Sequence, residues 1–206
     1  MRRGVTGSDP DVPEAERELE RRLALATPED SVRGMFFRSV VEVMRALGDE
    51  AAVERCLREC GERRFVDFTC YPTDSFLRLL WTAAWLLKDG YGDFEGALRA
   101  LGRRGAMDFF ASATGRPLQA LLGGDPKRLL DSLPMAYAVA SSTGSGRCQV
   151  TSAEHTALMS LDRDFLPRPY VEGALASALE VVGAREPRVR GRHTGPLASE
   201  YVLTWG

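Results

Sequence analysis

Residues Cys70–Lys88 read CYPTDSFLRLLWTAAWLLK and form the least polar helical pattern in the chain. At about 100° per residue, apolar side chains cover two adjoining faces of this helix, and only a thin stripe of Asp74, Arg78 and Thr82 is polar. A membrane span needs roughly 20 uncharged residues, so Arg78 in the middle of the segment argues against one. The pattern therefore predicts a central core helix. Its apolar residues are Phe76, Leu77, Leu80, Trp81, Ala83, Ala84, Trp85 and Leu87.

The composition excludes several classes of protein. The 206 residues fit one domain, and 27 Lys and Arg against 29 Asp and Glu give a net charge of −2, so no basic excess indicates nucleic acid or an anionic membrane surface. Four cysteines without a CxxC pair, and an N-terminus without a signal-peptide pattern, predict a reducing, cytoplasmic compartment. All basic residues except Lys88 and Lys127 are arginines, which fits either bidentate recognition of carboxylate or phosphate, or a GC-biased genome.

The chain divides into a tail, a helical part and a strand-rich part. Residues 1–12 lack apolar periodicity and predict a flexible tail. Residues 13–206 predict a single domain, in which 13–140 are helical and 141–206 contain strands.

Local signals divide the helical part into segments. A proline at the first helical position predicts a helix that begins at Thr27, and this helix ends at Gly48. The stretch Glu62–Cys70 is expected to be an irregular connection that still buries its aromatic side chains. Gly102 and Gly105 weaken a later helix, because each glycine costs about 1 kcal/mol relative to alanine.

The last third of the chain alternates in the way strands do. It predicts four short antiparallel strands with one helix between the second and the third. The fold class is therefore α+β, with a helical N-terminal two-thirds packed against a small four-stranded antiparallel sheet of order β-β-α-β-β. The expected strands are Arg147–Ser152, His155–Leu161, Arg188–His193 and Glu200–Trp205, and the expected helix is Tyr170–Val182.

Five strings in the chain resemble those of one protein family. They are TPEDSVRGMFF (Thr27–Phe37), RRFVDFTCYPTDSFLRLL (Arg63–Leu80), ALRALGRRGAMDF (Ala97–Phe109), GGDPKRLLDSLP (Gly123–Pro134) and GRHTGPLASEYVLTW (Gly191–Trp205). Together they look like the expanded family of uncharacterised proteins of similar length found in myxobacteria. That resemblance covers nearly the whole chain from Thr27 and implies no particular activity.

The order of elements is similar to a wider fold group. This group contains the heme nitric-oxide/oxygen-binding domains, the four-vinyl-reductase-like domains and the TRAPP-type vesicle-tethering subunits. The resemblance implies either a ligand or acyl chain held between the helices and the sheet, or a dimerising scaffold. It does not by itself fix a function.

The resemblance raises the question of heme. The heme-binding members need a proximal histidine on a helix in the first two-thirds and a Tyr-x-Ser-x-Arg element for the propionates. The chain has only His155 and His193, both in the predicted sheet part, and the string YVEGA from Tyr170 lacks the serine and the arginine. Neither heme nor another cofactor is therefore expected.

Aromatic side chains of the helical part are candidates for lining an apolar pocket, although most of them also fit a plain core. Cys70 stands at the entrance of the central helix, and the vesicle-tethering relatives imply that such a thiol can be acylated. The predicted ligand-binding residues are Phe68, Cys70, Trp81, Trp85, Phe109 and Phe110.

Two further groups of residues have a structural and a functional interpretation. Cys56 and Cys60 are four apart on one helix, but a closed zinc site needs four ligands, so buried cysteines and no metal are expected. Arg188, Arg190 and Arg192 alternate along a strand and share one face. That face is either a binding site for an acidic partner or phosphate, or a solvated surface paired with neighbouring acids.

No catalytic signature is present in the sequence. A nucleophile elbow, a P-loop and paired carboxylates at a sheet edge are all missing, and the string GRRG from Gly102 is too short to indicate phosphate binding. The sequence therefore favours a non-catalytic signalling or scaffold module that binds a protein partner as a homodimer. The alternative is a carrier or sensor of a small apolar, acyl-type ligand in a cavity between helices and sheet. A hydrolase or transferase is the third hypothesis.

Overall fold

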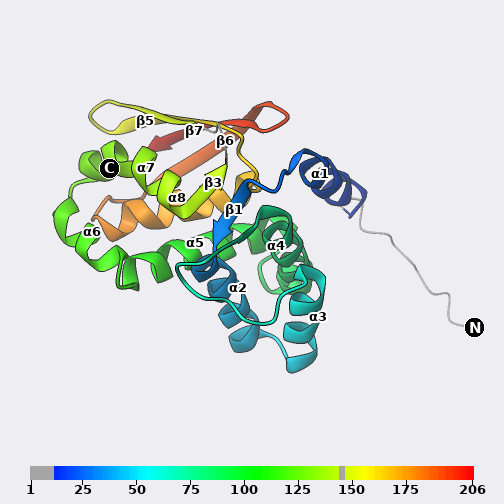
Figure 1. The fold of residues 1–206 in the computed structure, drawn as a ribbon. Coiled ribbons are helices and arrows are strands. Elements are labelled where there is room, and N and C mark those ends of the chain that lie inside the picture. Colours follow the sequence, from blue (N-terminus) through cyan, green and yellow to red (C-terminus); the bar gives the residue numbers. More distant parts are fainter. Residues whose placement is uncertain (1–11, 144–146) are drawn as a thin grey trace, which may run out of the picture.

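The computed structural model describes residues 12–143 and 147–206 (Figure 1). Helices dominate the chain up to residue 140, and an antiparallel sheet with one long helix follows, so the α+β class is confirmed. The predicted tail lies outside the described residues, apart from Val12. The helices are α1 Val12–Leu25, α2 Gly34–Leu47, α3 Glu50–Cys60, α4 Thr73–Leu87, η1 Lys88–Gly90, α5 Phe94–Ala111, α6 Gly115–Leu122, α7 Pro126–Ala140 and α8 Arg168–Val181. The strands are β1 Asp30–Arg33, β2 Cys70–Pro72, β3 Ser141–Thr143, β4 Cys148–Ser152, β5 Thr156–Asp162, β6 Arg188–Gly195 and β7 Ala198–Thr204.

Helix α4 is the central helix that its composition predicts. Leu77, Leu80 and Ala83 are fully buried, and helices α1, α2, α3 and α5 contact it. The buried Trp81 donates a hydrogen bond from its indole Nε1 to the carbonyl oxygen of Ala15 in α1, at 2.9 Å. A buried tryptophan needs such a partner for its N–H group. No helix in the described ranges is long and apolar enough to cross a membrane.

The prediction of a helix that begins at Thr27 was wrong. Residues Asp30–Arg33 form strand β1, and helix α2 begins at Gly34. Strand β1 is the middle strand of a three-stranded antiparallel sheet of order β2-β1-β3. The Asp30 carboxylate, expected in a helical first turn, instead accepts hydrogen bonds from Thr27 and pairs with Arg163 at 2.6 Å. Arg163 and the strands β2 and β3, all distant in the sequence, therefore stabilise a strand at this position.

The predicted four-stranded sheet is confirmed, with strand ends shifted by a few residues. Its order is β4-β5-β7-β6 and all pairs are antiparallel. Alternation places one set of side chains on an inner face, which α8 covers (Figure 1). The buried inner residues of the two middle strands are Ala157, Met159, Leu161, Tyr201 and Leu203.

Helices α5 and α8 cross with their backbones in direct contact. A Cβ atom at Gly102 would lie 1.9 Å from the carbonyl oxygen of Tyr170, and one at Gly173 would lie 2.0 Å from that of Arg99. Helix α5 is continuous through Gly102 and Gly105, where the sequence predicted a weakened helix. Glycine is required at Gly102 and Gly173 because the contact between the two backbones leaves no room for a side chain.

Ion pairs and a hydrogen bond around Glu172 also stabilise the crossing of α5 and α8. The buried Glu172 carboxylate accepts hydrogen bonds from Arg99 at 3.0 Å and Arg168 at 3.1 Å. It also accepts one from the backbone N–H of Gly191 in β6 at 2.9 Å. A buried carboxylate with several donors is satisfied, so it connects α5, α8 and the sheet at low cost.

We predict that Gly102→Ala and Gly173→Ala each lower the free energy of unfolding by about 3 kcal/mol, the upper end of overpacking costs, because the new Cβ atom would clash with backbone. Urea denaturation measures the change. Gly90→Ala is the matched control, since a Cβ atom at Gly90 meets nothing within 4 Å. Its cost should stay within about 0.5 kcal/mol. Equal costs at all three positions would contradict the close crossing.

Candidate ligand-binding cavity

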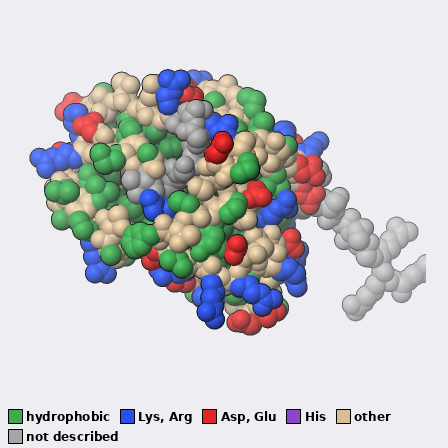
Figure 2. Space-filling view, viewed as in Figure 1, with side chains coloured by type: hydrophobic (Ala, Val, Ile, Leu, Met, Phe, Trp, Pro, Cys, Tyr) green, Lys and Arg blue, Asp and Glu red, His purple; other side chains and the backbone are tan. Residues whose placement is uncertain are grey.

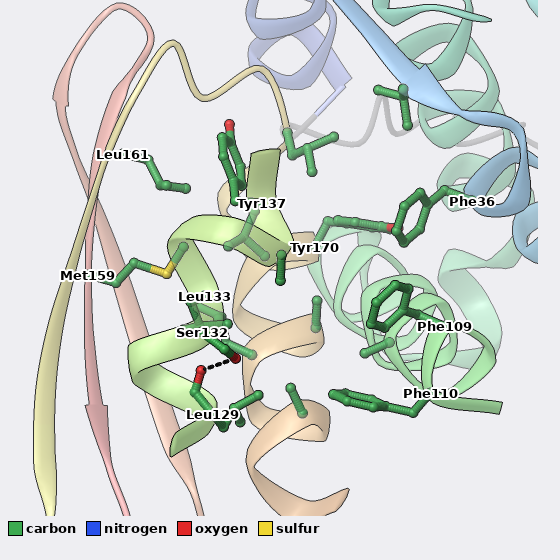
Figure 3. A pocket seen from close by; sticks show the side chains of 18 of the residues that line it. Phe36, Phe109, Phe110, Leu129, Ser132, Leu133, Tyr137, Met159, Leu161 and Tyr170 are labelled. Carbon is green, nitrogen blue, oxygen red and sulfur yellow. Dashed lines mark hydrogen bonds between the residues drawn. The ribbon is translucent and has the colours of Figure 1, made fainter. Parts of the chain in front are cut away.

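An apolar cavity of about 170 Å³ lies where helices α5, α7 and α8 meet the inner face of the four-stranded sheet (Figure 3). Leu129 and Leu133 of α7 line one side, and Met159 and Leu161 of β5 extend that wall. The leucines are four residues apart, so they lie on the same face of α7. Helix α7 therefore forms a wall of the cavity.

Aromatic rings form the opposite wall. Phe36 of α2 and Phe109 of α5 stack with their ring centroids 6.4 Å apart and an angle of 11° between planes. Phe110 meets Phe109 edge to face at 5.4 Å. These rings face Leu129 and Leu133 across the cavity (Figure 3). The space is thus bounded by aromatic rings on one side and aliphatic side chains on the other.

Few polar atoms reach the cavity. Of the described lining residues none is charged, and Ser132, Tyr137 and Tyr170 are the ones with a hydroxyl group. Ser132 donates its hydrogen bond to the carbonyl oxygen of Leu129 at 2.7 Å (Figure 3). Burial, together with the charge of Asp108, raises the pKa of Tyr170 above its ordinary value, so this hydroxyl keeps its proton.

Two of the six predicted ligand-binding residues line this cavity, Phe109 and Phe110. Trp81 lies in the core against α1, as described above. Trp85 is half-buried, packs at a tilt against Phe94 with ring centroids 4.6 Å apart, and borders a separate hollow. The two tryptophans therefore belong to the packing around α4.

Phe68 and Cys70 are exposed and do not line the cavity. Phe68 is 62% exposed, so the expectation that its loop buries all of its aromatic residues was wrong. Phe65 of the same loop and Tyr71 of β2 are half-buried, with ring centroids 4.7 and 5.5 Å from that of Phe37. Cys70 also lies on the short strand β2. Acylation of Cys70 stays a prediction.

Most of the lining residues are not among those predicted from the sequence. Leu129, Leu133 and Tyr137 recur every four residues on α7, and this period could have indicated one buried face. Met159 lies on the alternating apolar face that the sequence predicts for its strand, whereas Tyr170 carried no comparable signal, because the tertiary packing of α8 places it. Residue type alone therefore selected Phe68, Trp81 and Trp85, which do not line the cavity, together with Phe109 and Phe110, which do.

Cys56 and Cys60 are buried, as expected. Burial, followed by the neighbouring Cys60, raises the pKa of Cys56 to about 12, and burial also raises the pKa of Cys60. A thiol that keeps its proton is a poor metal ligand. Within residues 12–143 and 147–206 no group of three or more His, Cys, Asp and Glu could hold a metal ion.

Arg188, Arg190 and Arg192 are exposed and lie on one face of β6, as the alternation predicts. Arg192 donates to Glu200 on the neighbouring strand at 3.0 Å. At this position the face is therefore paired with an acid across the sheet. Val202, 48% exposed, stands opposite Arg190 on the same outer face.

A cluster of titratable residues lies outside the cavity, between α1 and the four-stranded sheet. The buried Asp164 accepts a hydrogen bond from the Tyr201 hydroxyl at 2.8 Å, and Arg22 donates to the carbonyl oxygen of Asp164 at 2.9 Å. Burial raises the pKa of Asp164 despite the opposing charge of Arg22. Ser199 lies 3.3 Å from Nδ1 of His193, but it is 1% exposed and is not part of the cavity lining. The cluster fixes α1 to the sheet and offers no accessible nucleophile.

The sequence from residue 25 to residue 206 matches the family model described as Protein of unknown function (DUF2378). The chain belongs to this family. The expected membership of a family without an assigned function is thus confirmed, while the myxobacterial origin stays a prediction. No curated protein matches the sequence of this DUF2378 chain.

The fold of the DUF2378 chain is similar to that of H-NOX proteins. An Fe(II) unliganded H-NOX protein from K. algicida matches with a TM-score of 0.64 and 10% identity, over 84% of this chain and 96% of that chain. A mutant Fe(II) H-NOX protein from S. oneidensis gives 0.65 and 10%, over 84% and 96%. A structure from a study of heme distortion in the H-NOX family gives 0.61 and 13%, over 84% and 94%. The expected likeness to the H-NOX fold is confirmed, and at such low identity it shows the fold alone. The likeness to four-vinyl-reductase-like and TRAPP-type proteins stays a prediction.

The residues that line the cavity do not fit heme. His155 lies beside Trp205, with ring centroids 6.3 Å apart, and His193 lies in the cluster at α1, so neither histidine reaches the cavity. Tyr170 and Met159 are of types that can ligate heme iron, but none of the described lining residues carries a positive charge for the propionates. The absence of a cofactor stays a prediction.

His193 gives the DUF2378 chain a testable pH dependence. Burial, and then Arg22, lower the pKa of His193, against the opposite effects of Glu18 and Asp164, with Arg168 acting in the same direction as Arg22. The unfolded chain then binds more protons than the folded chain just below about pH 6.5, so the free energy of unfolding falls as the pH drops through this range.

We predict that wild type loses more stability than His193→Gln between about pH 7.5 and about pH 5.5, because only the wild type carries the shifted histidine. Urea denaturation at both pH values measures the difference. His155→Gln is the matched control, since the chain has two histidines, and it should keep the wild-type pH dependence. Parallel pH profiles of wild type and His193→Gln would contradict the prediction.

Proposed function

We propose that this protein is a non-catalytic module that binds a small apolar ligand in the cavity between α5, α7, α8 and the four-stranded sheet. The observation that carries the proposal is a cavity bounded almost entirely by carbon atoms inside a fold like that of H-NOX proteins. The lining offers water almost no polar partners, whereas a buried water needs two to four.

The size of the cavity limits the ligand. At about 170 Å³ it is smaller than the 300–1,000 Å³ typical of pockets for drug-sized molecules. It is close to an engineered apolar cavity of about 150 Å³ that stays dry and binds benzene. The ligand that fits without rearrangement is therefore about as large as one six-membered ring with a small substituent. A long acyl chain would extend beyond this volume.

The lining supports binding over catalysis. General acid–base or nucleophilic chemistry needs convergent titratable groups, and the lining offers Tyr170 and Tyr137 among apolar side chains. The protein would then act as a carrier or sensor in the cytoplasm. Figure 2 shows positive and negative side chains scattered together over one face, which agrees with the near-neutral composition.

A protein partner or a second copy of the chain is a second candidate. The outer face of the four-stranded sheet exposes Leu158 and Val202, which are 39% and 48% exposed, beside Arg188 and Arg190. An apolar centre flanked by arginines is typical of interface surfaces. This surface supports the scaffold and homodimer hypothesis independently of the cavity.

The cavity proposal predicts that toluene raises the melting temperature of the wild-type protein in a concentration-dependent way, because a ligand that binds only the folded state stabilises it by RT ln(1 + [L]/Kd). Ala136→Leu places a larger side chain in the lining and should abolish the shift. Ala120→Leu, at an exposed position of α6, is the matched control and should keep it. Differential scanning calorimetry measures both. A toluene shift that persists in Ala136→Leu would contradict the assigned cavity.

The second candidate predicts a dimer that Val202→Asp converts to monomer, since a buried unpaired carboxylate is costly. Light scattering during size-exclusion chromatography measures the mass. Val66→Asp, at another exposed valine, should leave the mass unchanged. A monomeric wild-type protein at high concentration would rule out the homodimer.

A further inference from the structure

Tyr170 brings an unused hydrogen-bond donor to the cavity. Its side chain is 4% exposed and lines the cavity from the first turn of α8. Its hydroxyl makes no hydrogen bond to any other residue in the described part of the chain. By contrast, the buried Tyr201 donates to Asp164 at 2.8 Å. Buried tyrosine hydroxyls usually have a partner, so the Tyr170 hydroxyl is available to a partner from outside the chain, either water or a ligand.

The nearest acid does not satisfy this hydroxyl. The Asp108 carboxylate acts on Tyr170 through its charge, and its described hydrogen bonds come from Ser39 at 2.6 Å and Arg104 at 2.8 Å, with none from Tyr170. Among the other lining residues with a hydroxyl, Ser132 donates to Leu129, and Tyr137 has an interaction of its own. The described contacts therefore leave Tyr170 as the lining residue with an unpaired donor.

The surroundings hold the Tyr170 side chain in place. The ring packs edge to face on Phe76 at 6.1 Å, and its backbone oxygen is fixed at the crossing with Gly102. A Cβ atom at Gly105 would lie 2.8 Å from the hydroxyl oxygen, so this oxygen occupies the space that a side chain at position 105 would fill. Figure 3 places this hydroxyl beside the ring of Phe36 at the aromatic side of the cavity.

We propose that Tyr170 is a specificity-determining residue, which selects a neutral, compact ligand carrying one hydrogen-bond acceptor oxygen on an apolar body. A small cyclic ketone or lactone is the chemical class that fits. A hydrocarbon would leave the hydroxyl unpaired, and a carboxylate would find no cation among the described lining residues. This inference rests on the proposed function, and it adds the polar feature of the ligand.

Two probes of nearly identical shape test the inference. Cyclohexanone carries the acceptor oxygen, and methylenecyclohexane replaces it with a CH₂ group. Dissociation constants for both are measured by NMR titration of the wild-type protein and of Tyr170→Phe. Removal of one hydrogen bond should weaken cyclohexanone by roughly three- to tenfold and leave methylenecyclohexane within roughly twofold.

Two further variants separate a direct contact from a general loss of packing. Tyr201→Phe removes a buried hydroxyl outside the cavity. It should not change the ratio of the dissociation constant for methylenecyclohexane to that for cyclohexanone. Gly105→Ala should lower that ratio toward the value for Tyr170→Phe, because its Cβ atom displaces the hydroxyl.

The outcomes distinguish this inference from the function on which it depends. If both probes bind wild type but Tyr170→Phe weakens them equally, or leaves cyclohexanone unchanged, the role of Tyr170 is wrong while the cavity still binds ligands. If neither probe binds wild type at concentrations up to their solubility, the proposed function is wrong and the role of Tyr170 is wrong with it.

Discussion

The backbone contact between α5 and α8 at Gly102 and Gly173 is the constraint on which the rest of the structure depends. It fixes α8 over the four-stranded sheet and holds Tyr170 and the α5 aromatics around one space. That space stays open because the lining contains small side chains where larger ones would fill it. They are Ala106, Ala136, Ala174 and Ala178. The same close packing that stabilises the crossing therefore also forms the cavity.

Helix α7 connects this cavity to the rest of the molecule. Its residues Leu129, Leu133 and Tyr137 form one wall, and the helix leads directly into β3. Strand β3 pairs with β1, whose Val32 lines the cavity as well, and β1 leads into α2. A ligand that shifts α7 therefore acts on the three-stranded sheet through covalent and hydrogen-bonded neighbours. A ligand can shift a protein between two conformations only if it binds one of them more tightly than the other. A sensor would need a connection of this kind between its ligand site and the rest of the fold.

The sequence predicted what depends on local periodicity. The central helix α4 and the four strands of the terminal sheet follow from the 3.6- and 2-residue patterns of their apolar side chains. Strands β1, β2 and β3 were not predicted, because each has three or four residues and its partner strands lie far away in the sequence. At Gly102 helix propensity was misleading, since a tertiary contact outweighed it. The site was predicted from residue type, which selected the core residue Trp81 and the exposed Phe68 and Cys70 along with Phe109 and Phe110. Which of these aromatic residues line the cavity depends on where α7 and α8 pack in three dimensions.

A crystal structure determined under xenon pressure tests the central claim most directly, because xenon occupies dry apolar cavities of this size. The account predicts a xenon atom between the rings of Phe109 and Phe110 and the side chains of Leu129 and Leu133, with the helix crossing at Gly102 unchanged. A structure in which α7 closes against α5 and α8, with no xenon in that position, would contradict it.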